Sequence, residues 1–288
     1  MTAVSRIVAS APSRRGLPAA GAVWLLVFAA CNSGGSDSER PASSVPDSVA
    51  AASDEAPDGG EVRVVEQGLS VFPGPAQPGT GYTPEAVAAG QDHDVVSWGV
   101  VVENTSDWVA TYTDIAVDLV DPGGAVTLRD RPGAETVVVL LPGERYGTGH
   151  TGMLTEGGEP ADLEVEIGPS EWVTADARGV EFAEITARGI ETSNDERLRF
   201  VTAFAMESSY STSRPVWATA VFRNADGEII GGTSRANDTY GYDPDRTAAP
   251  GRSSGEITIS RTVPTVDDTQ SEVYLDPVSP EPGDTRLG

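Results

Sequence analysis

The sequence predicts an all-β protein, in which two tandem β-sandwiches follow a disordered N-terminal tether. Two observations predict this class. From Glu61 onward, short runs rich in Val, Ile, Thr and aromatic residues alternate with clusters of Gly, Pro, Asn and Asp, a pattern typical of sandwich strands and turns. The order of strands and turns then recurs after roughly a hundred residues, which indicates an internal duplication.

Nine runs have the length and composition of β-strands. In chain order they are 61–65, 94–103, 112–120, 136–141, 163–167, 197–206, 216–222, 255–260 and 272–275. The single helical signal is Thr83–Gly90, in which a threonine precedes an alanine-rich turn. The Pro and Gly content of 73–92 is compatible with an ordered excursion or with a flexible loop.

The duplication is visible when the sequence is shifted against itself. A shift of 103 places 98–106 on 201–209 and 117–124 on 220–227, and a shift of 108 places 142–147 on 250–255 and 165–167 on 273–275. The change of shift indicates a loop insertion, and the second copy has a longer polar loop at 233–249. We therefore expect a first sandwich over 61–176, a second over 177–277 and a disordered tail over 278–288.

Each copy contains one turn with a clear mechanism. In "DPGG", Asp121 can accept hydrogen bonds at the first turn position, Pro122 presets φ, and the glycines tolerate positive φ. In the second copy, "NADG" offers Asn224 and Gly227 for the same roles. Both turns are predicted to join adjacent strands as hairpins.

The first copy shares several positions with a known family: Asn104 in a turn, an aliphatic-x-aliphatic-x-Asp run at Val117, Leu119 and Asp121, and a Pro-Gly-Glu turn at Pro142, Gly143 and Glu144. This pattern resembles the FxLYD-type, immunoglobulin-like domains of bacterial lipoproteins. The second copy departs from it at Glu207, Phe222, Asn224 and Arg252. The resemblance implies two extracytoplasmic immunoglobulin-like sandwiches, and it supplies no catalytic residues.

The N-terminus has the organisation of an export signal, which we assign to residues 1–30. A basic region with Arg14 and Arg15 precedes an apolar run that is shorter than the roughly 20 residues of a membrane-spanning helix. The run ends in "FAAC", which looks like a bacterial lipobox, and this resemblance implies a lipid on Cys31. The alternative is a simple secretion signal with an incidental cysteine, although an unpaired exposed thiol suits an oxidising compartment poorly. The arginine pair leaves export by the Sec or the twin-arginine route open.

Residues 31–60 are rich in Ser, Ala, Pro, Gly and Asp and contain no aromatic residue. Such a segment buries too little apolar area to offset the entropy of ordering it, so we expect a disordered tether. The predicted protein is thus held to the outer, extracytoplasmic face of the cell membrane through the lipid on Cys31. The absence of Lys suggests GC-rich coding and an actinobacterial source.

The net charge of −25 opposes nucleic-acid binding, which depends on neutralising phosphates. The two histidines, His93 and His150, fall in different turns, and no Cys/His set for zinc remains once Cys31 is lipidated. Acidic segments at 92–94, 237–245 and 266–268 offer oxygen ligands for Ca²⁺, but none has an EF-hand pattern, and solvated loops are the simpler interpretation. We expect no cofactor, no metal and no catalytic residue.

One strand face differs between the copies. Alternation makes Ile115, Val117 and Leu119 core residues of the first copy, with Asp114, Ala116 and Asp118 outside. The equivalent core set of the second copy is Ala218, Ala220 and Phe222, and its outer set is Trp217, Thr219 and Val221. An apolar outer face indicates either a surface covered by the other copy or a loop, or a binding face centred on Trp217.

We therefore expect an envelope-anchored lipoprotein, not an enzyme, that displays binding or scaffolding domains to another envelope protein or a cell-wall ligand. Two other classes stay open. An extracytoplasmic hydrolase would use a carboxylate pair in a cleft. A solute-binding component of an importer would need two α/β lobes, and the sequence has little helical pattern.

Overall fold

The computed structural model describes residues 60–72, 94–154, 159–177, 180–195, 199–236, 246–260 and 263–279, and over 127–134 it describes the backbone alone. All the regular secondary structure of these residues is β-strand, so the predicted all-β class is confirmed. Contacts divide the chain into residues 1–46 and 47–288. All described residues belong to the second unit, while Cys31, the helical signal at Thr83–Gly90 and most of the predicted tether lie outside them.

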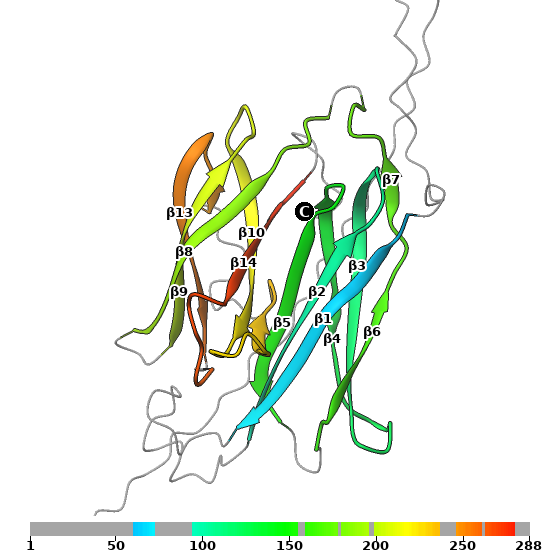
Figure 1. The fold of residues 1–288 in the computed structure, drawn as a ribbon, viewed down its shortest axis with the longest axis vertical. Coiled ribbons are helices and arrows are strands. Elements are labelled where there is room, and N and C mark those ends of the chain that lie inside the picture. The colour runs from blue at the N-terminus through cyan, green and yellow to red at the C-terminus, as the bar shows by residue number, and fades with distance from the viewer. Residues whose placement is uncertain are drawn as a thin grey trace, which may run out of the picture. The chain divides into compact units, whose positions relative to one another are not determined.

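The first seven strands form two sheets of one sandwich (Figure 1). They are β1 (Val62–Phe72), β2 (Val95–Asn104), β3 (Val109–Val120), β4 (Val126–Leu140), β5 (Arg145–Met153), β6 (Asp162–Ile167) and β7 (Glu171–Val173). One sheet has the order β1-β2-β5, and the other has the order β4-β3-β6, with β7 also paired to β3. All the pairings are antiparallel.

The two sheets of the first sandwich share one apolar core. From β2 it takes Val96, Trp98, Val100 and Val102, and from β3 it takes the predicted set Ile115, Val117 and Leu119. Burial alternates along β3, which is the period-2 pattern of a strand with one face against a core, whereas almost every residue of β2 is buried, so both faces of that strand are covered.

The second sandwich comprises β8 (Ile185–Asn194), β9 (Phe200–Ser208), β10 (Arg214–Arg223), β11 (Ile229–Thr233), β12 (Thr247–Ala248), β13 (Gly251–Ile259) and β14 (Glu272–Pro277). One sheet has the order β13-β9-β8, and in the other β10 pairs with β11, β12 and β14. Its core contains the predicted Ala218, Ala220 and Phe222 of β10. Phe200 meets Phe222 edge to face at a centroid distance of 5.4 Å.

The pairing scheme of the first sandwich recurs in the second. The order β1-β2-β5 corresponds to β8-β9-β13, and β4-β3-β6 corresponds to β11-β10-β14. The register recurs as well, since Val117 pairs with Val165 and Ala220 with Val273. These pairs are related by the shifts of 103 and 108. The assignment of the sandwiches to the immunoglobulin-like class stays a prediction.

The shift of 103 is wrong by one residue in the strand before this pair. It places Trp98 on Val201, yet Trp98 lies in its core while Thr202, not Val201, is buried in the second sandwich. The buried residues of β9 follow those of β2 at a shift of 104, because the second copy has one residue fewer between equivalent core positions of the two strands: Val102 and Ile115 are 13 positions apart, and Met206 and Ala218 are 12 apart. A one-residue slip moves every side chain to the opposite face, so this correction decides which residues of β9 face solvent.

The two predicted Asx-Gly turns form as expected. Asp121 Oδ1 accepts hydrogen bonds from the amides of Gly123 (2.8 Å) and Ala125 (2.9 Å). In the second copy, Asn224 Oδ1 accepts from Asp226 and Glu228, each at 3.0 Å. Gly124 and Gly227 have φ of 80° and 82°, which L-residues rarely adopt.

Candidate functional site

The outer face of β10 lies against the first sandwich. Thr219 and Val221 are fully buried, and Trp217 is partly buried. Thr219 Oγ1 donates a hydrogen bond to the carbonyl of Gly147 on β5, and Val221 packs with Val101 of β2. Of the two interpretations of this face, coverage by the other copy is the one that matches this geometry.

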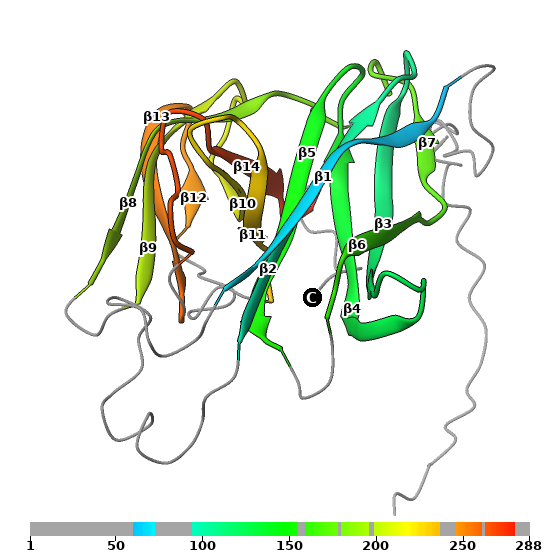
Figure 2. The ribbon, with the colours of Figure 1, turned by 60° about the horizontal axis from the view of Figure 1, so that its bottom comes forward.

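Each sandwich contributes one sheet to this interface. The sheet β1-β2-β5 lies between the β4-β3-β6 sheet and the β11-β10-β14 sheet of the second sandwich (Figures 1 and 2). The contact therefore joins the outer faces of two unlike sheets. Three groups of contacts hold the two sheets together. Glycine residues meet at the centre of the interface, and two separate networks of charged side chains lie elsewhere along it.

Glycines let the two sheets approach closely. A Cβ at Gly147 would lie 2.7 Å from Cγ2 of Val221, and one at Gly149 would lie 2.6 Å from Cα of Gly232. Real Cβ atoms do not approach this closely, so both positions require the absence of a side chain. These residues were not singled out from the sequence, although glycines spaced within a strand pattern are a known signal of close backbone approach.

Hydroxyl groups satisfy the backbone at the glycine contact. Thr151 Oγ1 donates to the carbonyl of Gly232 (2.8 Å), while Ser97 Oγ accepts from the amide of Gly232 (3.3 Å). The two hydroxyl oxygens are 2.7 Å apart. Ser70 of β1 donates in the same way to the carbonyl of Ile230. These bonds add to stability because each buried polar group that lacked a partner would cost about 1–3 kcal/mol.

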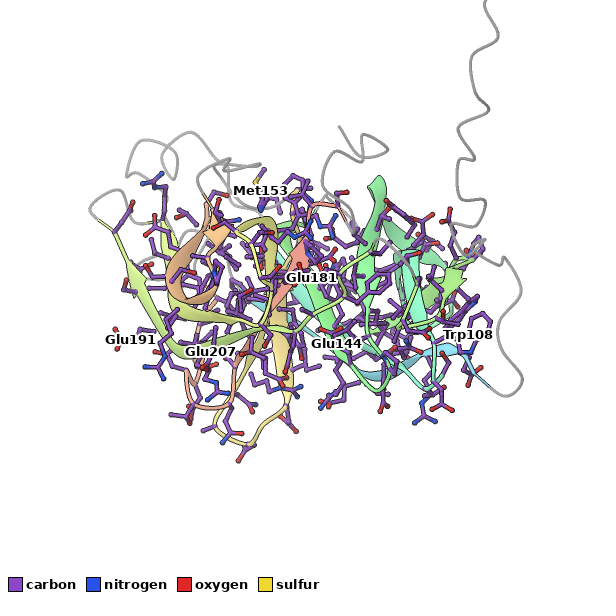
Figure 3. All side chains as sticks on the ribbon, turned by 90° about the horizontal axis from the view of Figure 1, so that it is seen from above. Trp108, Glu144, Met153, Glu181, Glu191 and Glu207 are labelled. Carbon is purple, nitrogen blue, oxygen red and sulfur yellow. The ribbon has the colours of Figure 1, made fainter. Side chains whose placement is uncertain are left out.

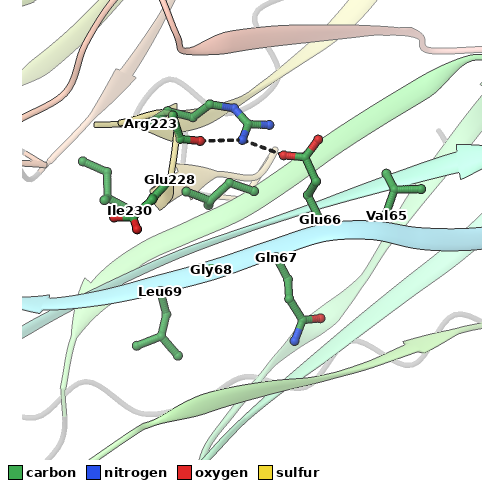
Figure 4. Close-up of a pocket in the computed structure, with 10 residues that line it drawn as sticks. Val65, Glu66, Gln67, Gly68, Leu69, Arg223, Glu228 and Ile230 are labelled. Carbon is green, nitrogen blue, oxygen red and sulfur yellow. Dashed lines mark hydrogen bonds and ion pairs between the residues drawn. The ribbon is translucent and has the colours of Figure 1, made fainter. Parts of the chain in front are cut away.

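The first charged network borders a pocket between β1 and β11 (Figure 4). Arg223 Nη1 lies 2.6 Å from Glu66 Oε2 and 3.0 Å from the carbonyl of Gly227, and Arg223 Nη2 lies 2.9 Å from Glu272. Glu66 also pairs with Arg145 of β5. Burial alone would raise the pKa of Glu66, but the bonds to Arg223 and Arg145 outweigh it and lower that pKa. The pocket has a volume of about 650 Å³.

The second network centres on Asp276, a fully buried residue of β14. Its carboxylate accepts hydrogen bonds from the amides of Val138 (2.8 Å) and Val139 (3.0 Å) on β4 of the first sandwich. These amides lie on the edge strand of the β4-β3-β6 sheet. A buried side chain thus satisfies amides that strand pairing leaves open.

Arg235, which follows β11, neutralises this acidic site. It pairs with Asp276, and its Nε lies 2.9 Å from Glu135 Oε1. The guanidinium also lies 5.3 Å from the ring centroid of Trp217, and the hydroxyl of Tyr146 donates to Glu135 at 3.3 Å. Trp217 therefore acts as a wall of an internal charged network.

The carboxylates of this region bind protons more tightly than usual. Burial raises the pKa of Asp276 to about 6, although Arg235 and the two amides oppose the change. Burial likewise raises the pKa of Glu135. Burial and the nearby charges of Asp276 and Glu184 raise the pKa of Glu144 to about 7, even though Glu144 accepts the Leu141 amide at 2.7 Å.

The remaining candidate residues are placed apart from one another. The prediction that His150 lies in a turn is wrong: it lies within β5, beside Trp98, with ring centroids 6.4 Å apart. Asp268 accepts hydrogen bonds from the amide and hydroxyl of Thr192, and Asp267 accepts from Thr269. His93 and residues 237–245 lie outside the described residues.

Two searches of the described ranges returned nothing. They contain no group of three or more His, Cys, Asp or Glu side chains arranged to hold a metal ion. They also contain no helix with the length and apolar character to span a bilayer.

Comparison with known proteins found no counterpart. No protein-family model matches the chain, and neither the curated proteins nor the solved structures include a match.

Proposed function

We propose that this protein is a lipid-anchored module of the bacterial cell envelope that presents two rigidly joined β-sandwiches as a non-catalytic binding or scaffolding surface. The anchor is the lipid on Cys31, and the FxLYD-like pattern supports the extracytoplasmic location. The observation that carries the proposal is the interface, where the buried Asp276 joins β14 to the edge of β4 and Arg235 neutralises it.

A display role suits this construction because the interface limits relative motion of the two sandwiches. Inter-domain contacts that are large and apolar restrict motion, whereas small polar ones permit it. Here glycine-mediated sheet contact and buried ion pairs act together. A fixed pair of sandwiches would hold any binding surface at constant orientation on a flexible tether, which reduces the entropy lost on binding.

The test separates anchoring from binding. Wild type and Cys31→Ala are expressed in an actinobacterial host, and their membrane and soluble fractions are compared by mass spectrometry. We expect a diacylated Cys31 peptide in the wild-type membrane fraction and release of the variant. An unmodified Cys31, or a chain that still begins at Met1, would refute the anchor.

Cross-linking of intact cells then tests the binding role. We expect the wild type to form a discrete cross-linked species with an envelope component, and Cys31→Ala to lose it. If the anchored wild type forms no such species, the display role is refuted while the anchor stands.

A further inference from the structure

A second groove lies where the first sandwich meets the open side of the second. It is bounded by the β4–β5 turn (Gly143 to Tyr146), by β8 with the preceding Glu184, and by β14 with the preceding Ser271. Its volume is about 430 Å³, within the range of small-molecule sites. Figure 3 labels Glu144 in the region between the two sandwiches.

The equivalent seam of the first sandwich is bridged by a side chain. The groove walls β8 and β14 correspond to β1 and β6 of the first sandwich. There, Gln67 Nε2 of β1 closes the seam by donating to the carbonyl of Leu163 on β6 at 3.1 Å. In the second copy, the equivalent seam between β8 and β14 borders the groove. The floor of the groove is apolar and includes Ile185, Ile190 and Leu275.

The groove is negatively charged at one end. Glu144 and Glu184 both line it, and the charge of Glu184 is close enough to contribute to the raised pKa of Glu144. Among the residues that the structure describes, no ion pair joins either carboxylate to an arginine. Arg145, the one basic residue of the lining, is paired with Glu66, and Glu272 is paired with Arg223.

One partly exposed aromatic ring, that of Tyr274, completes the wall. The ring of Tyr146 lies behind it, buried, with the two ring centroids 5.9 Å apart. The Tyr274 hydroxyl donates to Glu272 at 2.9 Å. Aromatic faces attract cations, and desolvated sites strengthen that attraction. Apolar floor, aromatic wall and two carboxylates without basic partners complement one chemical group, a positively charged amine on an aliphatic chain.

We propose that this groove binds a small aliphatic ammonium compound. The ammonium group lies against Glu144 and Glu184, and the alkyl chain lies on Ile185, Ile190 and Leu275. This inference goes beyond the proposed function, because the site forms whether or not Cys31 carries a lipid.

The test is a titration of the purified full-length chain with n-pentylamine, followed by NMR amide shifts at pH 8. We expect saturable shifts confined to the groove residues and at least a tenfold weaker response to 1-pentanol, which has the same chain without the charge. Glu144→Gln should weaken n-pentylamine binding about tenfold while melting at or above the wild-type temperature. Glu164→Gln removes an exposed carboxylate on β6 and should leave binding unchanged.

Three outcomes would overturn the proposal. They are equal shifts with 1-pentanol, unchanged affinity in Glu144→Gln, and shifts spread over the acidic surface that Glu164→Gln reduces as much as Glu144→Gln does. A lower affinity at pH 6 than at pH 8 would support it, because protonation removes the carboxylate charge that attracts the ligand. None of these results depends on the lipid anchor.

Discussion

The two sandwiches pair their strands in the same order but differ in the faces they turn outward. On β3 the outer residues include Asp114 and Asp118, whereas β10 has Trp217 and Val221 at the equivalent positions. On β5 the outer residues are Gly147 and Gly149, while β13 has Ser254 and Glu256, both exposed. Each copy thus keeps one face adapted to contact and one adapted to water.

The difference between the contact faces and the water-facing faces limits the stack to the four sheets of the two sandwiches. The internal contact uses the outer face of β1-β2-β5 and that of β11-β10-β14, so the equivalent faces on β8-β9-β13 and β4-β3-β6 are left at the two ends of the stack. The remaining faces carry Glu164 and Glu166 on the first sandwich and Glu256 on the second. Acidic residues on the terminal faces of a repeat prevent further association.

The largest expected effect comes from removing the charge that crosses the interface. Asp276→Ala leaves the amides of Val138 and Val139 without their partner and Arg235 with only Glu135. Loss of one partner of a buried pair costs about 3–5 kcal/mol, so we expect chemical denaturation to show a loss of about 3–4 kcal/mol. The exposed Asp162→Ala is the control, and an equal loss there would contradict the central role of Asp276.

A slightly smaller effect is expected from filling the glycine contact. Gly149→Val places side-chain atoms against Gly232, and overpacking typically costs about 1–3 kcal/mol. The matched change is Glu256→Val at the corresponding, exposed position of β13, which should cost less than about 0.5 kcal/mol. Thermal melting of both variants measures the difference. Equal destabilisation would show that the two faces are not distinguished in this way.

Lowering the pH from 7.5 to 5 should increase the stability of the folded protein. The folded pKa values of Asp276 (about 6) and Glu144 (about 7) lie above the ordinary values of these side chains, 3.8 and 4.5. The folded state therefore binds these protons more tightly, and the stability they contribute is present at low pH and lost as pH rises through 6 to 7. We expect the free energy of unfolding to increase by about 1–2 kcal/mol from pH 7.5 to pH 5.

Glu144→Gln is the control for this pH dependence and should reduce it to the part that Asp276 contributes. Glu66 acts in the opposite sense, because its lowered pKa makes its contribution disappear as pH falls below about 4.5. Stability that falls steadily from pH 7.5 to 5 would contradict the placement of these carboxylates.

The smallest losses of stability are expected from changes in the Asx-Gly turns, which the two copies share. Asp121→Ala and Asn224→Ala each remove a side chain that accepts two turn amides. Each should cost about 1 kcal/mol, and the two losses should agree within about 0.5 kcal/mol and add in the double variant. Urea denaturation of the single and double variants tests this, and a large difference would show that the turns are not equivalent.

Particular strands show which elements could be predicted from the sequence and which could not. The runs at 112–120 and 216–222 predict β3 and β10 because aliphatic alternation is strong there. β5 was missed because "RYGTGHTGM" is rich in glycine, which weakens an isolated strand but suits one pressed against another sheet. β8 was missed because its outward residues are charged and its pairing is interrupted at Gly189.

The sequence by itself determined the β class, the alternating cores and the two Asx-Gly turns, since these depend on period-2 patterning and on φ preferences that act within a few residues. Only the tertiary structure decided that Trp217 faces Arg235, that Asp276 reaches the edge of β4, and that β9 follows β2 at a shift of 104. The bonds from the amides of Val138 and Val139 to Asp276 join residues more than a hundred positions apart, and Trp217 meets Arg235 across two neighbouring segments of the second sandwich. Local composition carries no information about which distant surfaces will meet, because that choice depends on shape and charge complementarity of whole sheets.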